Sequence, residues 1–346
     1  MEGAFHDIPR VDASRCATVC GLNITEEYID YLGISGEKAE KMKKGVRDMH
    51  AFMQKIGIND TFCCAPQILG HFPLKGEHTV TGESSQVVFQ NSVMGARCNC
   101  EGMVVHGCAA MLGKIPNTGY HITENRWGTH LIKVECIPKD VLDWDILGYW
   151  IGKKVGVGVP VIDVDVPSVS PDAHKSLGAA ICSGGQVDMY HILGLTPEAG
   201  TLDMAFGKNT PKAVYTYTEK DREETLKFLN FSSKTDVDMV ILGCPQYSIY
   251  QVRDAARYLE GKHCKARLVV QTPQMLIDQA RKNGDAQLIE AAGGFLLADT
   301  CVPMCGLWPE NVTCVATDSV KNACYIPGDR PDIEIHMGTM EQCAAR

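Results

Sequence analysis

The sequence predicts an α/β protein built from three-layer α/β/α domains with mostly parallel sheets. Two observations lead to this class. From residue 212 onward, short β-branched runs alternate with amphipathic stretches, a pattern that favours a parallel sheet covered on both faces. The chain has 346 residues, of which 45% are hydrophobic. That is enough apolar material for about two domains, and it excludes the disordered and fibrous classes.

A first helix is expected over residues 35–56, because apolar side chains recur there at helical spacing. Methionines in such a stripe also occur on binding surfaces, but they more often belong to a core, and we interpret them as core. Gly57 is expected to end the helix. The stripe consists of Met42, Val46, Met49, Met53 and Ile56.

The amino-acid composition changes twice in the segments that follow. Residues 61–126 are rich in Gly, Ser, Asn and His, as polar loops around a site often are. The β-branched run at 155–166 predicts a buried strand, and a mixed segment follows it to about residue 207. Gly156 and Gly158 do not form a dinucleotide-binding fingerprint, since a third glycine and a following helix pattern are missing.

The clearest alternation of strands and helices begins at residue 212. Strands are expected at 213–217, 237–243, 266–272, 294–298 and 311–317, and helices at 219–230, 247–260 and 273–283. We therefore place an N-terminal α/β domain at residues 1–150, a mixed α/β segment at 151–211 and a doubly wound α/β domain at 212–346.

Charge and hydropathy narrow the possible partners. Lys and Arg number 33 against 42 Asp and Glu, so the net charge is -9 and no nucleic acid is expected to bind. No apolar run is long enough to span a bilayer, and the first ten residues lack the features of a signal peptide. A cytoplasmic protein without a membrane partner is expected.

The chain contains 16 cysteines, an unusual number for this length. In a reducing compartment most of them are expected to be buried thiols that fill space. No two cysteines are separated by two residues, so zinc ribbons, ferredoxin-like runs and thioredoxin-type pairs are excluded. Any metal site must therefore be assembled from distant segments.

The ends of the expected strands supply candidates for such a site, because ligands of parallel sheets bind beyond the carboxyl ends of the strands. Cys244 and Cys301 both follow strands, as do Ser319 and Lys321, and Cys64 offers a third thiol after the first helix. Purely structural roles for these cysteines are about as well supported as a metal site. An iron–sulfur cluster with one exposed iron suits three thiols, and zinc in an open site suits them less well.

Several motifs closely resemble the large, catalytic subunit of the aconitase X family. The longest is GESSQVVFQNSVMGARCNCEG at 82–102, followed by GKIPNTGYHITENR at 113–126. Matches run in the same order over about residues 24–346. The supporting motifs are CAPQILGHFPLKGEH (64–78), LGCPQYS (242–248), ADTCV (298–302), TDSVKNACYIPG (317–328) and the ending EQCAAR.

The resemblance implies an iron–sulfur hydro-lyase of the aconitase superfamily with three α/β domains and a smaller swivelling domain that is often a separate chain. Relatives dehydrate cis-3-hydroxy-L-proline or mevalonate 5-phosphate, so the expected substrate is a small hydroxy acid. The family's cluster cysteines correspond to Cys64, Cys244 and Cys301, holding a [4Fe–4S] cluster or a smaller form with an open iron. The base is expected to be a serine of the small subunit.

The remaining family positions imply residues that hold and polarise the substrate. Arg97 and Lys321 are the natural anchors for a carboxylate or phosphate. His121 also matches the pattern but ranks lower, since a lone histidine is more often a satisfied hydrogen-bonding group. The implied catalytic residues are Ser84, Ser85 and Lys321, and the implied substrate-binding residues are Asn91, Ser92, Arg97, Asn99, Ser319 and His78.

Departures from the family pattern leave alternatives open. Cys98 and Cys100 stand where the family has Thr and Arg, and Asp318 replaces Asn, so the cluster ligands and the substrate could differ from those of the relatives. Residues 1–23 are too few to hold the family's N-terminal motif near the site. A zinc-dependent lyase or hydrolase on the same scaffold, or a non-catalytic binding or assembly subunit, is therefore the alternative function.

Overall fold

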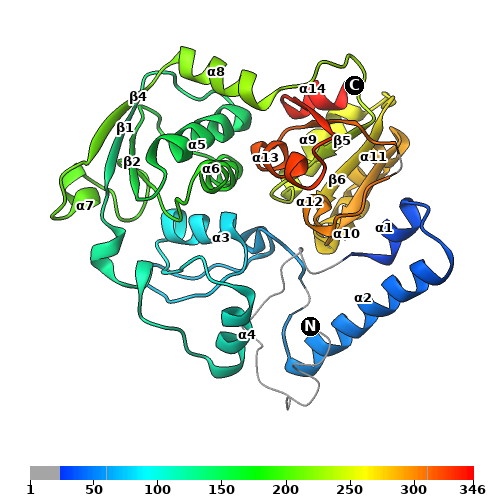
Figure 1. Cartoon of the computed structure of the whole chain (residues 1–346), viewed down its shortest axis with the longest axis horizontal. Helices are drawn as coiled ribbons and strands as arrows, with labels where there is room; N and C mark the ends of the chain where they lie inside the picture. Colours follow the sequence, from blue (N-terminus) through cyan, green and yellow to red (C-terminus); the bar gives the residue numbers. More distant parts are fainter. Residues whose placement is uncertain (1–23, 60, 310) are drawn as a thin grey trace.

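Two parallel sheets organise the protein in a computed structural model that describes residues 24–59, 61–309 and 311–346 (Figure 1). Every strand pairing within the two sheets is parallel, so the predicted α/β class with mostly parallel sheets is confirmed. The expectation about residues 1–23 lies outside the described residues. In the part of the chain that is described, no helix is long and apolar enough to cross a membrane.

The first sheet has the strand order β3-β2-β1-β4. Its strands are β1 (His130–Val134), β2 (Pro160–Asp163), β3 (His191–Ile192) and β4 (Ala213–Tyr217). The helices around it are α5 (Val141–Val155), α6 (Pro171–Gly184), the short α7 (Leu202–Phe206) and α8 (Glu219–Leu229). A buried cluster joins strands β1 and β2 to α5 and α6, with Ile132, Leu147 and Leu177 fully buried.

Helices α5 and α6 approach each other unusually closely. A Cβ atom at Gly152 of α5 would lie 2.3 Å from the carbonyl oxygen of Ile181 in α6. Only glycine therefore fits at this crossing, and its place in a helix interior is explained by packing and not by flexibility.

The second sheet has the order β7-β6-β5-β8-β9. The chain moves from β5 outward through β6 to β7 and then returns to the other side of β5 for β8 and β9, so the order reverses between β5 and β8. Ligands of open parallel sheets bind at this kind of switch point. The strands are β5 (Met239–Leu242), β6 (Arg267–Thr272), β7 (Gly294–Ala298), β8 (Cys314–Thr317) and β9 (Glu334–Met337).

Helices cover both faces of the second sheet, as the three-layer prediction requires. One face packs on α9 (Ile249–Leu259), α11 (Asp285–Ala291) and α14 (Met340–Ala344). The other packs on α13 (Val320–Asp329), and α5, α6 and α13 lie between the two sheets (Figure 1). The remaining helices of this part are α10 (Gln274–Asn283) and α12 (Val302–Cys305).

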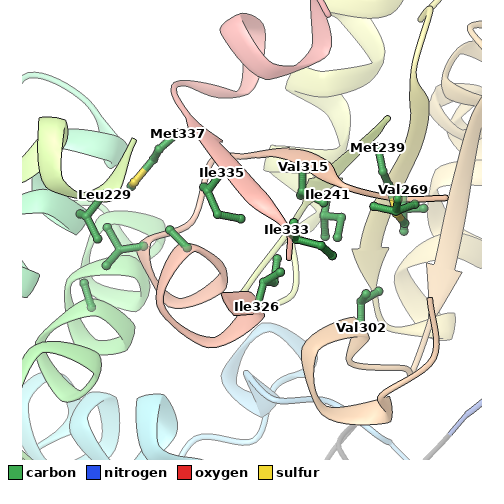
Figure 2. Close-up of a cluster of buried hydrophobic side chains, with 14 of the residues drawn as sticks. Leu229, Met239, Ile241, Val269, Val302, Val315, Ile326, Ile333, Ile335 and Met337 are labelled. Atoms are coloured by element: carbon green, nitrogen blue, oxygen red, sulfur yellow. The ribbon is translucent and has the colours of Figure 1, made fainter. Parts of the chain in front are cut away.

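The apolar cluster between the two sheets holds the domains together. Figure 2 shows Ile241, Val315 and Ile335 of the second sheet facing Ile326 of α13, with Leu229 of α8 at the far end. Ile146 of α5 belongs to the same cluster. The contact between the domains is therefore a shared hydrophobic core, which fixes the position of one sheet relative to the other.

Short helices interrupt the polar loops that the sequence predicted before the first sheet. Apolar residues such as Val88 and Phe89 are buried here, but buried polar residues stand between them and hide the helical period. Helix α3 packs against α6 (Figure 1). The elements are α1 (Glu26–Tyr31), α2 (Gly36–Ile56), a 3-10 turn (Pro66–Leu69), α3 (Ser84–Phe89), a π-helical turn (Gln90–Met94), α4 (Met103–Leu112) and the 3-10 turns Gly119–His121 and Thr123–Arg126.

Three further features differ from the sequence-based expectations. Strand β4 pairs with β1, so it extends the first sheet instead of the second. The boundaries expected at 150/151 and 211/212 both fall within the span of that first sheet. The methionine stripe of α2 is half-buried and only its last residue, Ile56, is buried, since α2 contacts little besides α1.

Candidate active site

The three candidate cysteines come from three separate loops that meet at the switch point. Cys64 lies just before the 3-10 turn Pro66–Leu69, Cys244 follows β5, and Cys301 is the residue before α12. The backbone N–H of Gln246 donates to the Sγ of Cys64 at 3.2 Å. Burial raises the pKa of Cys244 well above its usual value, and the neighbouring thiols of Cys301 and Cys64 raise it further. Both other candidate cysteines thus contribute to the electrostatic surroundings of Cys244.

Two buried glutamines connect these loops. Gln246 accepts a hydrogen bond from the backbone N–H of Cys64 through Oε1, at 3.1 Å. Gln271, on β6, donates from Nε2 to the carbonyl of Gly243 at 3.4 Å and accepts from the N–H of Val302 at 3.0 Å. Gln246 thus joins the first cysteine loop to the second, and Gln271 joins the second to the third. Sequence reasoning missed both residues, although a glutamine inside the apolar run of β6 is a usable signal.

An ion pair lies beside the cysteines. The ammonium of Lys321 contacts the carboxylate of Glu83, and it also donates to the hydroxyl of Ser84 at 3.3 Å. Burial lowers the pKa of Lys321, but the carboxylate of Glu83, with smaller contributions from Cys182 and Cys244, outweighs burial and raises the pKa well above its usual value. Lys321 therefore stays protonated at neutral pH, within the electrostatic reach of Cys244.

The serines named from the sequence are part of the same arrangement. Ser85 donates from Oγ to Glu83 at 3.3 Å. Ser319 caps α13 by accepting from the N–H of Asn322 at 3.2 Å, and its hydroxyl donates to the carbonyl of Cys244. Glu83 was missed as an individual residue, although it belongs to the quoted motif GESS.

A half-buried carboxyl group, that of Asp318, lies at the switch point, just after β8. Burial raises its pKa to about 6. The hydroxyl of Tyr247 donates to one carboxyl oxygen and the N–H of Gly243 donates to the other, the latter at 3.4 Å. These hydrogen bonds tie the end of β8 to the loop that follows β5.

Two of the implied substrate-binding residues hydrogen-bond with neighbouring segments of the chain. Asn91 is fully buried, donating to the carbonyl of Cys98 at 2.7 Å and accepting from the guanidinium of Arg126 at 3.0 Å. The hydroxyl of Ser92 accepts from the N–H of Tyr190 at 2.9 Å. These hydrogen bonds do not involve Cys64, Cys244, Cys301 or Lys321, and they fix the π-helical turn to the segments around it.

Arg97, Asn99 and His78 form a second, separate group. The guanidinium of Arg97 donates to the carbonyl of His121 at 2.7 Å. His78 and His121 stack, with their Nδ1 atoms 2.9 Å apart. Asn99 accepts from the N–H of Tyr120 at 2.8 Å.

Arg97 also lines a cavity of about 320 Å³ to which neither Lys321 nor any of the three candidate cysteines contributes. The other residues around this cavity are Lys75, Gly76, Thr123, Arg126, Trp127, His191, Glu198 and Met204. Arg97 and Lys321, the two predicted anion anchors, therefore lie at different sites: Arg97 lines this cavity, and Lys321 pairs with Glu83.

The additional cysteines differ in their surroundings. Cys98 is buried, and burial raises its pKa to about 12. Burial also raises the pKa of Cys100, and the charge of Glu83 adds to this while that of Lys321 opposes it. Cys182, which the sequence analysis did not single out, lies with its sulfur 3.5 Å from the hydroxyl of Ser84. Cys100 and Cys182 are thus both neighbours of the Glu83–Lys321 pair.

Among residues 24–59, 61–309 and 311–346, no group of three or more His, Cys, Asp or Glu side chains is arranged to hold a single metal ion.

Family models and a solved structure point to the same family over nearly the whole chain. Family models described as the first, second and third domains of aconitase X match residues 14–124, 128–227 and 237–346. A crystal structure of Thermococcus kodakaraensis aconitase X in its holo-form superposes with a TM-score of 0.81 at 27% identity, covering 98% of this chain and 90% of that one.

Two groups of curated relatives are dehydratases. The phosphomevalonate dehydratase large subunit of Methanothermobacter thermautotrophicus is 35% identical over 295 residues, which cover 85% of this chain and 71% of the relative. The cis-3-hydroxy-L-proline dehydratase of Pseudomonas aeruginosa is 32% identical over 299 residues. That match covers 85% of this chain but spans only 50% of the relative.

Proposed function

This chain belongs to the aconitase X family, and from that premise we propose that it is the large subunit of an iron–sulfur hydro-lyase that dehydrates a small hydroxy acid. The single observation that supports the proposal most is that hydrogen bonds of Gln246 and Gln271 join the loops that carry Cys64, Cys244 and Cys301, near the Lys321–Glu83 pair. These residues are far apart in the sequence, and their convergence at a sheet switch point is typical of a ligand site.

The donor set fits an iron–sulfur cluster. Thiolates are the ligands such clusters use, and Cys64, Cys244 and Cys301 supply three of them while leaving one iron without a protein ligand. The same side chains do not close around a single ion, so no observation favours the zinc-dependent alternative. When bound, the cluster would supply a Lewis acid for the hydroxyl group that leaves.

Lys321 would bind the negatively charged group of the substrate. Its raised pKa keeps the ammonium charged, and its low exposure means that the charge is weakly screened by water. The carboxylate of Glu83 neutralises Lys321 in the free protein, so an incoming carboxylate or phosphate would share or replace this contact. The hydroxyls of Ser84 and Ser85 would then orient the substrate, since both already hydrogen-bond with members of the pair.

We propose a small partner subunit as the source of the base that removes the proton from the neighbouring carbon, through a serine hydroxyl. The naming of similar proteins as large subunits supports such a partner. We propose that Asn91, Ser92, Arg97, Asn99 and His78 support the 82–102 segment from its neighbours. Asn91 and Ser92 contact the backbone at 188–190, and the other three contact residues 118–123.

The substrate is proposed to be cis-3-hydroxy-L-proline or a related hydroxy acid. To test this, the chain is purified without oxygen together with its small partner and assayed for water loss from cis-3-hydroxy-L-proline and from mevalonate 5-phosphate. A brown protein with turnover of one of these compounds is expected. An iron-loaded complex that dehydrates neither compound would support a binding role instead, and a colourless, iron-free protein would refute the proposal.

A further inference from the structure

The side-chain amide of Gln246 is buried and only half satisfied. The residue is 2% exposed, and its Oε1 accepts from the N–H of Cys64. Its Nε2 is buried and has no hydrogen-bond partner. A buried amide N–H without a partner costs about 1–3 kcal/mol, so such a group needs an explanation.

The position of this amide is fixed from both sides. The backbone N–H of Gln246 donates to the sulfur of Cys64, so backbone and side chain of one residue both contact that cysteine. Behind it, the ammonium of Lys175, which is buried in α6, donates to the carbonyl of Gln246 at 2.8 Å and to Oε1 of Gln251 at 2.5 Å. Asp172 pairs with Lys175 at 3.2 Å.

The second connecting glutamine has no spare group. Both amide atoms of Gln271 are used, one on the carbonyl of Gly243 and the other on the N–H of Val302. Both residues therefore join loops, but of the two only Gln246 has an amide nitrogen without any hydrogen-bond partner. That nitrogen belongs to the amide that contacts Cys64, one of the three candidate cluster ligands.

We propose that Gln246 is a positioning residue that holds Cys64 in place through Oε1 and donates a hydrogen bond from Nε2 to a sulfur atom of the bound cluster. This inference rests on the proposed iron–sulfur function and adds a residue to it. Hydrogen bonds to cluster sulfurs stabilise the reduced state, because they offset the added negative charge. The amide should therefore raise the reduction potential and slow the loss of iron.

Two variants distinguish the effect of losing the Nε2 hydrogen bond from the effect of adding a negative charge. Gln246→Met keeps the approximate length of the side chain without a donor, and Gln246→Glu keeps the acceptor for the Cys64 N–H but adds negative charge. Gln274→Glu is the matched control, because Gln274 is exposed just after β6. The holo-protein is titrated for its midpoint potential, and the rate of iron release to a chelator is measured.

The wild-type potential should exceed that of Gln246→Met, which should exceed that of Gln246→Glu, while Gln274→Glu matches the wild type. Iron release from Gln246→Met should be roughly 10- to 100-fold faster than from the wild type, as is usual when an outer-shell partner of a metal ligand is removed. Folded, iron-loaded Gln246 variants with unchanged potential and iron release would overturn this inference alone. A wild-type protein that binds no iron would refute the proposed function and this inference with it.

Discussion

Removing the ammonium of Lys321 should destabilise the protein, because the carboxylate of Glu83 would be left without its partner. The side chains are only 14% and 18% exposed. Breaking a fully buried ion pair costs about 3–5 kcal/mol, and the residual exposure here reduces the expected loss for Lys321→Met to about 2–3 kcal/mol. The free energy of unfolding is measured by urea titration.

A double-mutant cycle identifies the cause of that loss. Adding Glu83→Gln to Lys321→Met removes the unpaired charge, and the double variant should regain at least about 1 kcal/mol relative to Lys321→Met alone. Lys220→Met, which breaks an exposed pair on α8, should leave stability unchanged. If the double variant were as unstable as Lys321→Met or less stable, the unpaired carboxylate would not be the reason.

Two further changes test the fold around the site. The pKa of Asp318 is about 6 in the folded chain and about 4 when unfolded, so stability should fall by up to about 3 kcal/mol as pH rises from 4 to 6 and stay lower above that range. Asp318→Asn should flatten this part of the pH profile and stabilise the protein at pH 7, as followed by urea midpoints. Gly152→Ala should cost about 1–3 kcal/mol or more in thermal unfolding, since its Cβ would meet the carbonyl of Ile181. The control Gly107→Ala in α4, where a Cβ meets nothing within 4 Å, should stabilise by about 0.5–1 kcal/mol.

The grouping of residues at strand ends could be predicted because it follows from sheet geometry. Cys244 and Ser319 follow β5 and β8, and these two strands are neighbours in the sheet. The strand and helix bounds from residue 213 onward also agree with the sequence pattern to within a few residues, since buried β-branched runs and amphipathic helices alternate clearly there.

Other features depend on contacts between distant segments and leave little trace in local sequence. The helical segment from Ser84 to Met94 buries Gln86, Gln90 and Asn91, so polar residues do not mark its exposed face. The pairing of β4 with β1 could not be predicted from the strand pattern either. The order of strands in a sheet depends on how complete strand–helix segments pack together, and the sequence of one strand does not show this. Gln246 gains its role only from the distant Cys64 loop.

The most direct test of the central claim is the iron and acid-labile sulfide content of single-cysteine variants purified without oxygen. Cys64→Ala, Cys244→Ala and Cys301→Ala should each lose the cluster and its visible absorbance while remaining folded. Cys264→Ala, which removes a buried thiol packed on the far face of the second sheet, should keep both. Wild-type iron and sulfide in any of the first three variants, or their loss in Cys264→Ala, would contradict a cluster held by these three cysteines.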